Sequence, residues 1–137
     1  MMREIKFRAW DKDKKQMLPV CDMSFGDDGR ALTVIFQTAP KEKYYRGLVY
    51  GENGILMQYI GLKDRSGKEI YEGDIVSYGV RGLGNIGSNK LEHKLYGPVE
   101  WMQGSCCWWL VDNHMGAGNI YEIIGNIHEN PELVKAQ

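Results

Sequence analysis

A Gly-x-Gly-x-x-Gly string occurs at residues 82–87, and this pattern can bind the phosphates of a dinucleotide. It does so when it leads from a strand into a helix whose N-terminus holds the pyrophosphate. The residues that follow, 88–95, are too few and too polar to form the crossover helix of a βαβ unit. We therefore predict no cofactor and interpret the segment as a loop between strands, where binding residues often lie.

Metal or thiol chemistry would depend on three histidines and three cysteines. They lack the C-x-x-C or H-x-x-x-H spacing that presents two ligands to one metal, so we predict no metal site. Cys106 and Cys107 adjoin two tryptophans in a predicted hairpin, which offers no base or helix N-terminus to activate a thiol. We expect both in the hydrophobic core and all three cysteines, including Cys21, to be reduced and partly buried.

The carboxylates give no better case for catalysis. Asp27, Asp28 and Asp74 could act as acids or bases, but each lies beside glycine in a predicted turn. Aspartate in such turns bonds its own backbone, so a structural role is expected. No Ser-His-Asp arrangement can be proposed either, and we predict a protein without catalytic residues that is not an enzyme.

Aromatic residues interleaved with basic ones are the most suggestive surface feature. Adjacent residues of a strand point to opposite faces, so one of Trp108 and Trp109 should face outward. An exposed tryptophan could stack on a nucleic-acid base or anchor a protein interface, unless a second layer such as the N-terminal hairpin covers it. The other residues of this set are Trp10, Tyr44, Tyr45 and Trp101, with the basic Lys6, Arg8, Lys43 and Arg46.

These side chains would be positioned by short strands, since apolar and polar residues alternate and glycine-containing turns separate the runs. Pro19 lacks a donor and should lie on an edge strand. The first strand should have one wet face, Ala31–Phe36 should be buried, and Gln37–Tyr50 is interpreted as a loop. The predicted strands are Ile5–Trp10, Met17–Val20, Ala31–Phe36, Ile55–Ile60, Asp74–Tyr78, Val99–Gln103, Cys106–Val111 and Glu122–His128.

Several short strands without sustained helical periodicity predict an all-β fold, or α+β if the middle segment is helical. We place an N-terminal β-sheet region at residues 1–60 and an SH3-like small β-barrel at residues 61–137. A polar turn at Lys63–Lys68 is expected to join two strands within Met57–Val76, and a second turn is expected at Gly73-Asp74. Asn130-Pro131-Glu132 has the residue order of a helix start, so the barrel should end in a short helical turn.

Four segments spread over nearly the whole chain resemble the YopX family. They are Arg3–Asp11, Met57–Val76, Gly97–Trp101 and Ile123–Leu133. The resemblance implies a small phage- or prophage-encoded protein of β-rich, SH3-like barrel character, and it carries over no catalytic residue. The chain departs from the family pattern in the glycine-rich loop after Val76 and in Cys106–Trp109, where specificity would differ.

Charge and hydropathy constrain the partners. The net charge is -1, from 17 basic and 18 acidic residues, so no overall positive field attracts nucleic acid or an anionic membrane. No apolar run approaches the roughly 20 residues of a bilayer span, and Arg3-Glu4 leaves no room for a secretory h-region. We expect a cytoplasmic protein of a bacterial host cell without membrane contact.

The leading hypothesis is therefore an accessory protein that acts by protein contact, as a homo-oligomer or with an unidentified protein partner. One alternative is a nucleic-acid-binding barrel that would use Arg81, Lys90 and Lys94 together with Trp101, Trp108 and Trp109. A third is an enzyme whose site forms across an oligomer interface, where His93, His114 or His128 would meet a carboxylate.

Overall fold

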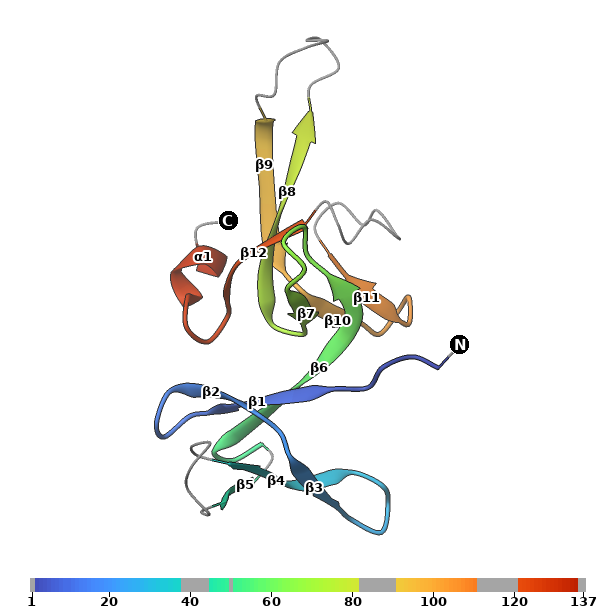
Figure 1. Cartoon of the computed structure of the whole chain (residues 1–137), viewed down its shortest axis with the longest axis vertical. Helices are drawn as coiled ribbons and strands as arrows, with labels where there is room; N and C mark the ends of the chain where they lie inside the picture. Colours follow the sequence, from blue (N-terminus) through green and yellow to red (C-terminus); the bar gives the residue numbers. More distant parts are fainter. Residues whose placement is uncertain (1, 38–44, 50, 82–90, 111–120, 136–137) are drawn as a thin grey trace. The chain divides into compact units, whose positions relative to one another are not determined.

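The computed structural model describes residues 2–37, 45–49, 51–81, 91–110 and 121–135, which form strands and one short helix (Figure 1). The prediction of an all-β fold is confirmed, since the middle segment contributes a strand. The elements are β1(Phe7–Asp11), β2(Gln16–Pro19), β3(Asp22–Phe25), β4(Ala31–Gln37), β5(Tyr45–Val49), β6(Gly54–Lys63), β7(Glu69–Tyr71), β8(Asp74–Arg81), β9(Leu91–Pro98), β10(Glu100–Met102), β11(Cys107–Trp109), β12(Tyr121–Asn126) and α1(Pro131–Lys135).

The chain forms two compact units, Met1–Tyr59 and Ile60–Gln137. Strand β6 contributes to both, because it pairs with β1 through its first residues and is also a neighbour of β7. No helix in the described part of the chain has the length and apolar character needed to cross a membrane.

In the first unit, β1 pairs with β2 on one side and with β6 on the other. Pro19 lies on β2, at the sheet edge, as predicted from its missing donor. The expected wet face of β1 is wrong, because Ala9, Trp10 and Asp11 are all buried. Successive residues of a strand point to opposite faces, so both faces of β1 are covered at its C-terminal end.

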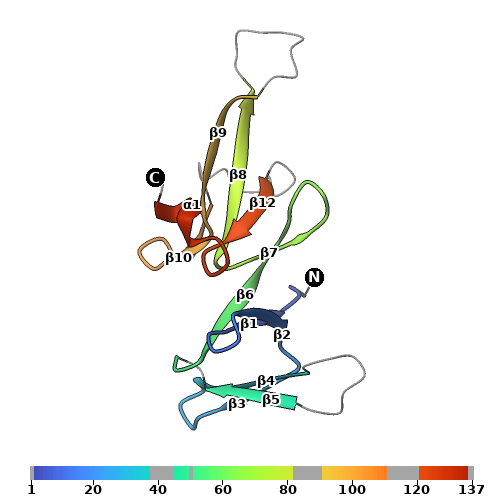
Figure 2. The same cartoon turned by 90° about the vertical axis from the view of Figure 1, so that its left-hand side faces the viewer.

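A three-stranded antiparallel sheet, with β4 between β3 and β5, completes this unit (Figure 2). The interpretation of residues 37–50 as a loop is wrong for β5, whose Leu48 is fully buried. Leu48 packs so closely on Gly54 that a Cβ at the glycine would lie 2.8 Å from Leu48 Cβ. The expected burial of β4 is also incorrect at Leu32, which is 52% exposed.

In the second unit, β8 pairs with β12 on one side and with β9 on the other. The sequence did not predict β9, and the Gly-x-Gly-x-x-Gly string at 82–87 lies outside the described residues. Buried side chains from separate strands and from the residues between them form one core; they are Ile60, Ile70, Val76, Val99, Leu110 and Tyr121. Closure of these strands into an SH3-like barrel stays a prediction.

The C-terminal segment folds back on β12 through two asparagines. Asn126 Oδ1 accepts bonds from the amides of His128 at 3.0 Å and Glu129 at 2.8 Å. Asn130 Oδ1 accepts from the Asn126 amide at 3.3 Å, and its side chain covers Gly125 at a bulge in β12. The predicted helical turn after Asn130 is confirmed as α1.

Candidate functional site

Strands β10 and β11 form a hairpin that carries three of the six predicted site residues. They pair antiparallel, with Glu100 opposite Trp109, Trp101 opposite Trp108, and Met102 opposite Cys107. The residues on either side of the hairpin, Val99 and Leu110, belong to the core of the second unit. The base of the hairpin is therefore anchored in the core by the residues that flank its two strands.

Trp101 and Trp108 form an aromatic pair on one face of this hairpin. Their ring centroids are 5.1 Å apart and their planes meet at 73°, the edge-to-face arrangement that aromatic quadrupoles favour. Trp108 is partly buried and packs against the core, whereas Trp101 is 49% exposed. The core thus holds Trp108, and Trp108 holds Trp101 at the surface.

Of the two tryptophans predicted to face opposite ways, Trp108 is the one that packs against the core, and neither is fully exposed. Both are partly buried, and the exposed tryptophan of the hairpin is Trp101. Alternation does place Trp108 and Trp109 on opposite faces, as expected, but both faces of β11 are partly covered.

The core role predicted for the two hairpin cysteines is wrong for Cys106, whereas Cys107 is partly buried, as expected for the thiols. Cys106 is exposed and Cys107 only partly buried, because the turn extends over residues 103–106 and Cys106 does not belong to a strand. Cys106 has φ 50°, a left-handed conformation that few residues other than glycine adopt. Its thiol donates to Gln103 O at 3.5 Å. None of the three cysteines forms a disulfide, and Cys21, expected partly buried, is exposed.

The basic residues of the nucleic-acid hypothesis are on other elements. Arg81 ends β8, with its Cα opposite Leu91, and Lys94 lies on β9 opposite Gly79. Lys90 is outside the described residues. The structure therefore places Arg81 and Lys94 on a different sheet from Trp101.

The structure describes the side chains of only some of the remaining aromatic, basic and histidine candidates. Trp10 is buried in the first unit, so it belongs to the structure and is no surface residue. His128 is partly buried after β12, and within the described residues no group of three or more His, Cys, Asp or Glu could hold a metal ion. Outside the described residues lie His114, Lys43 and Tyr44, and the side chains of His93, Tyr45 and Arg46 are likewise not described.

A structural role was predicted for Asp27, Asp28 and Asp74, and the structure shows it for Asp28 and Asp74. Asp28 Oδ1 accepts from the Arg30 amide at 3.0 Å, and the buried Asp74 accepts from the Tyr71 amide at 2.8 Å. For Asp27 the structure shows, among the described residues, no side-chain hydrogen bond to the backbone of its turn. The carboxylates of Asp28 and Asp74 therefore hold turns.

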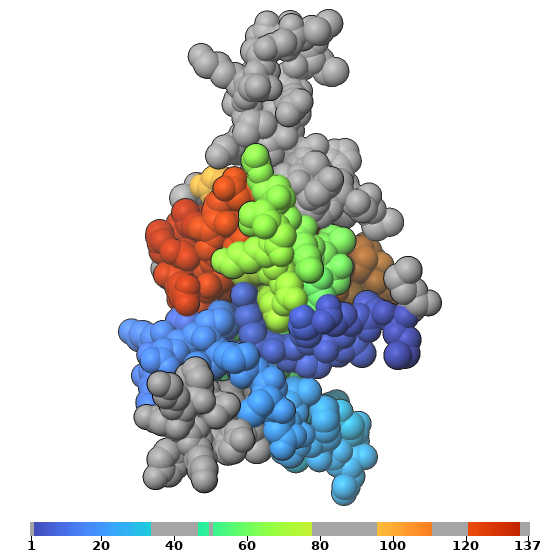
Figure 3. Space-filling view, in the orientation of Figure 1, coloured from blue at the N-terminus to red at the C-terminus, as the bar shows by residue number. Residues whose placement is uncertain are grey.

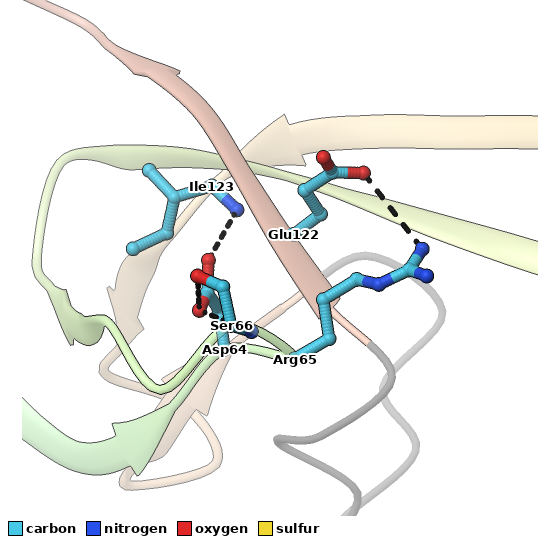
Figure 4. A network of polar contacts seen from close by, with 5 residues as sticks. All are labelled: Asp64, Arg65, Ser66, Glu122 and Ile123. Carbon is cyan, nitrogen blue, oxygen red and sulfur yellow. Dashed lines mark hydrogen bonds and ion pairs between the residues drawn. The ribbon is translucent and has the colours of Figure 1, made fainter.

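Asp64 is a stronger polar centre, at the turn between β6 and β7 (Figure 4). Its Oδ1 accepts from Ser66 N at 2.9 Å, Ser66 Oγ at 2.7 Å and Lys68 N at 2.9 Å. Its Oδ2 accepts from Ile123 N of β12 at 3.2 Å, so one carboxylate joins two segments that lie side by side in the space-filling view (Figure 3).

The environment of Asp64 keeps it ionised. Burial alone would raise the pKa of this carboxyl, but the hydrogen bonds outweigh burial and lower the pKa from its ordinary value of 3.8. The nearby ion pair between Arg65 and Glu122 spans 4.0 Å and is largely exposed, so it contributes little to stability. Asp64 is accordingly a structural anchor of the second unit.

Among the exposed apolar residues that sequence reasoning missed are Met102, at 41%, and Phe25, at 57%. Met102 has a signal in the sequence, since a strand that points Trp101 to one face must point Met102 to the other. Phe25 ends β3 and carries no such signal, because the glycines and aspartates that follow it are typical of a turn.

Comparison with known proteins gives the family. No curated protein matches the chain. Protein EF1440 from Enterococcus faecalis has a similar crystal structure, with 28% identity, a TM-score of 0.67, and coverage of 97% of this chain and 99% of that one. Protein yopX from Bacillus subtilis shares the fold at 19% identity, with a TM-score of 0.56 and the same coverage of both chains. The family model described as YopX protein matches residues 6–135, so the chain belongs to the YopX family.

Proposed function

We propose that this chain is a non-enzymatic protein-interaction module that self-associates through the aromatic face of its β10–β11 hairpin. The observation that carries the proposal is the exposed Trp101 ring held against Trp108, which itself packs on the core. Tryptophan is enriched among the residues that dominate binding energy at protein interfaces. The resemblance of the sequence implies that such a module serves a phage or prophage.

Preorganisation supports this role. Trp101 need not give up side-chain freedom when a partner covers it, because the Trp108 ring already restrains it. In a two-fold dimer the same surface is used twice, so one exposed tryptophan per chain provides two anchors.

The charge of the hairpin favours a protein partner over nucleic acid. Residues 100–109 contain one charged side chain, the acidic Glu100, and no lysine or arginine. Proteins that stack bases on aromatic rings combine those rings with a basic groove for the phosphates. Arg81 and Lys94 are on the β8–β9 pair, so the hairpin itself supplies no such groove.

The test is the molar mass of the native chain over a wide concentration range, by sedimentation equilibrium. We expect the wild type to dimerise with rising concentration and Trp101→Ala to remain monomeric. Phe25→Ala is the matched control, since Phe25 is a comparably exposed aromatic residue in the other unit, and it should dimerise as the wild type does.

A wild type that stays monomeric throughout, or a Trp101→Ala chain that dimerises normally, would refute self-association through this face. Affinity capture from infected cells, with and without nuclease, tests the nucleic-acid alternative. Binding that is lost with nuclease, and that weakens steeply as salt rises, would replace the proposal with nucleic-acid binding.

A further inference from the structure

The turn end of the β10–β11 hairpin gathers three sulfur-bearing side chains. Met102 and Cys107 are directly opposite each other across the two strands, and Cys106 immediately precedes Cys107. Side chains at directly opposite positions of an antiparallel pair have Cβ atoms about 4.5–5.5 Å apart. The thioether of Met102 and the thiol of Cys107 therefore start from the same face of the hairpin.

The conformation of Cys106 releases its thiol from the alternation of a strand. In a continuous strand, Cys106 and Cys107 would point to opposite faces and could not share a ligand. Cys106 is instead in the turn, with φ 50°, which breaks that alternation. Its thiol makes one long hydrogen bond, to Gln103 O, and can turn from it at little cost.

All three sulfur atoms belong to accessible residues. Met102 is 41% exposed, Cys106 is exposed and Cys107 is partly buried, and none is in a disulfide. Core packing therefore does not account for three sulfur side chains within six residues. Thiolate and thioether ligands together select soft ions, copper(I) above all.

We propose that Met102, Cys106 and Cys107 form a binding site for a single copper(I) ion. Both cysteines bind as thiolates and release two protons to the solvent, while Met102 donates a lone pair and loses no proton. Copper enters as copper(I), so no electron is transferred. Because Trp101 points to the other face of β10, the site is separate from the self-association surface.

The experiment is competition for copper(I) with the chromophoric chelator bicinchoninate, under reducing and oxygen-free conditions. We expect the full-length chain to withdraw one copper(I) ion per chain, and Cys106→Ser and Cys107→Ser to lose this capacity. Met102→Leu should weaken binding by at least roughly tenfold, because loss of a ligand should cost no less than loss of an outer-shell partner. Cys21→Ser is the matched control, because it removes an exposed thiol from the first unit.

Two further measurements distinguish loss of copper binding from misfolding and from self-association. Cys106 and Met102 are exposed, so their variants should keep the wild-type circular dichroism, and native mass spectrometry should find the copper on single chains. Failure of the wild type to compete would overturn the site. So would equal losses in Cys21→Ser and Cys106→Ser, or copper found only between two chains. Trp101→Ala should bind copper as the wild type does, so the site can fail or stand independently of self-association.

Discussion

Two turns of the second unit each reverse the chain between two strands, but with different interactions. The β6–β7 turn has the buried Asp64 carboxylate accepting four hydrogen bonds, and glycine at its left-handed position, Gly67 with φ 89°. The β10–β11 turn has exposed residues, one backbone bond of 3.3 Å from Ser105 to Met102, and a cysteine in the left-handed conformation.

The difference indicates what each turn is for. Every local choice in the Asp64 turn agrees with the fold, which is typical of segments that specify structure. The Cys106 turn breaks the rule that glycine takes the left-handed position, and such departures concentrate where function constrains the residues. The contrast supports a structural role for the first turn and accords with the binding site proposed at the second.

The largest effect should come from Asp64→Ala. This change leaves the amides of Ser66, Lys68 and Ile123 without their acceptor, and we expect it to lower the free energy of unfolding by about 3 kcal/mol. Urea denaturation measures it. Asp28→Ala is the control, an exposed turn aspartate with a bond to the Arg30 amide, and should cost less than about 1 kcal/mol. Equal costs for the two variants would contradict the anchoring role of Asp64.

Acid should weaken the Asp64 turn in a predictable direction. The pKa of Asp64 is lowered in the folded chain, so its contribution to stability is complete above the unfolded value of 3.8 and is lost as the pH falls through the folded pKa. Urea denaturation from about pH 6 to about pH 2 should therefore show a smaller acid loss in Asp64→Asn than in the wild type. Parallel curves would show that Asp64 binds protons equally in both states.

Gly67→Ala should cost about 1 kcal/mol, because alanine is strained at positive φ. A Cβ at Gly67 would meet no atom within 4 Å, so the cost is conformational and no steric clash contributes. Thermal or urea denaturation measures the loss. An unchanged stability would mean that the turn can relax to another conformation, which would blur the contrast between the two turns.

The smallest effect has the opposite sign. Cys106→Gly removes the side chain from a left-handed position, which relieves strain, but glycine also loses more conformational entropy on folding. We expect the free energy of unfolding to rise by about 0.5 kcal/mol on balance. The same variant should lose copper(I) binding, so stability and binding would move in opposite directions. A clear loss of stability would show that the Cys106 side chain supports the turn, and the contrast with Gly67 would fail.

Much of the fold was predictable where local chemistry and tertiary structure agree. The turns at Lys63–Lys68 and Gly73-Asp74 have polar and glycine residues that reverse a backbone, and the edge position of Pro19 follows from its missing donor. Strands β3, β5 and β9 were missed because few of their residues are types that favour strands. Pairing with neighbouring strands holds these segments extended.

The candidate site was predictable only in part. The sequence singled out the hairpin tryptophans and the strand alternation that separates Trp108 from Trp109. It could not show that Trp101 is the exposed ring, because exposure depends on what the core covers. It also could not show that Cys106 leaves the strand, because a left-handed cysteine has no signature in residue type.

Strand β6 has a consequence for the evolution and engineering of this chain. The boundary between the two units falls between Tyr59 and Ile60, inside an unbroken strand, whereas domains that recombine usually meet at exposed linkers. An exchange of modules at this point would divide β6 and leave the strands beside it with unpaired edges, which promote aggregation. The two units should therefore be inherited together, and chimaeras should join at the turns that flank β6.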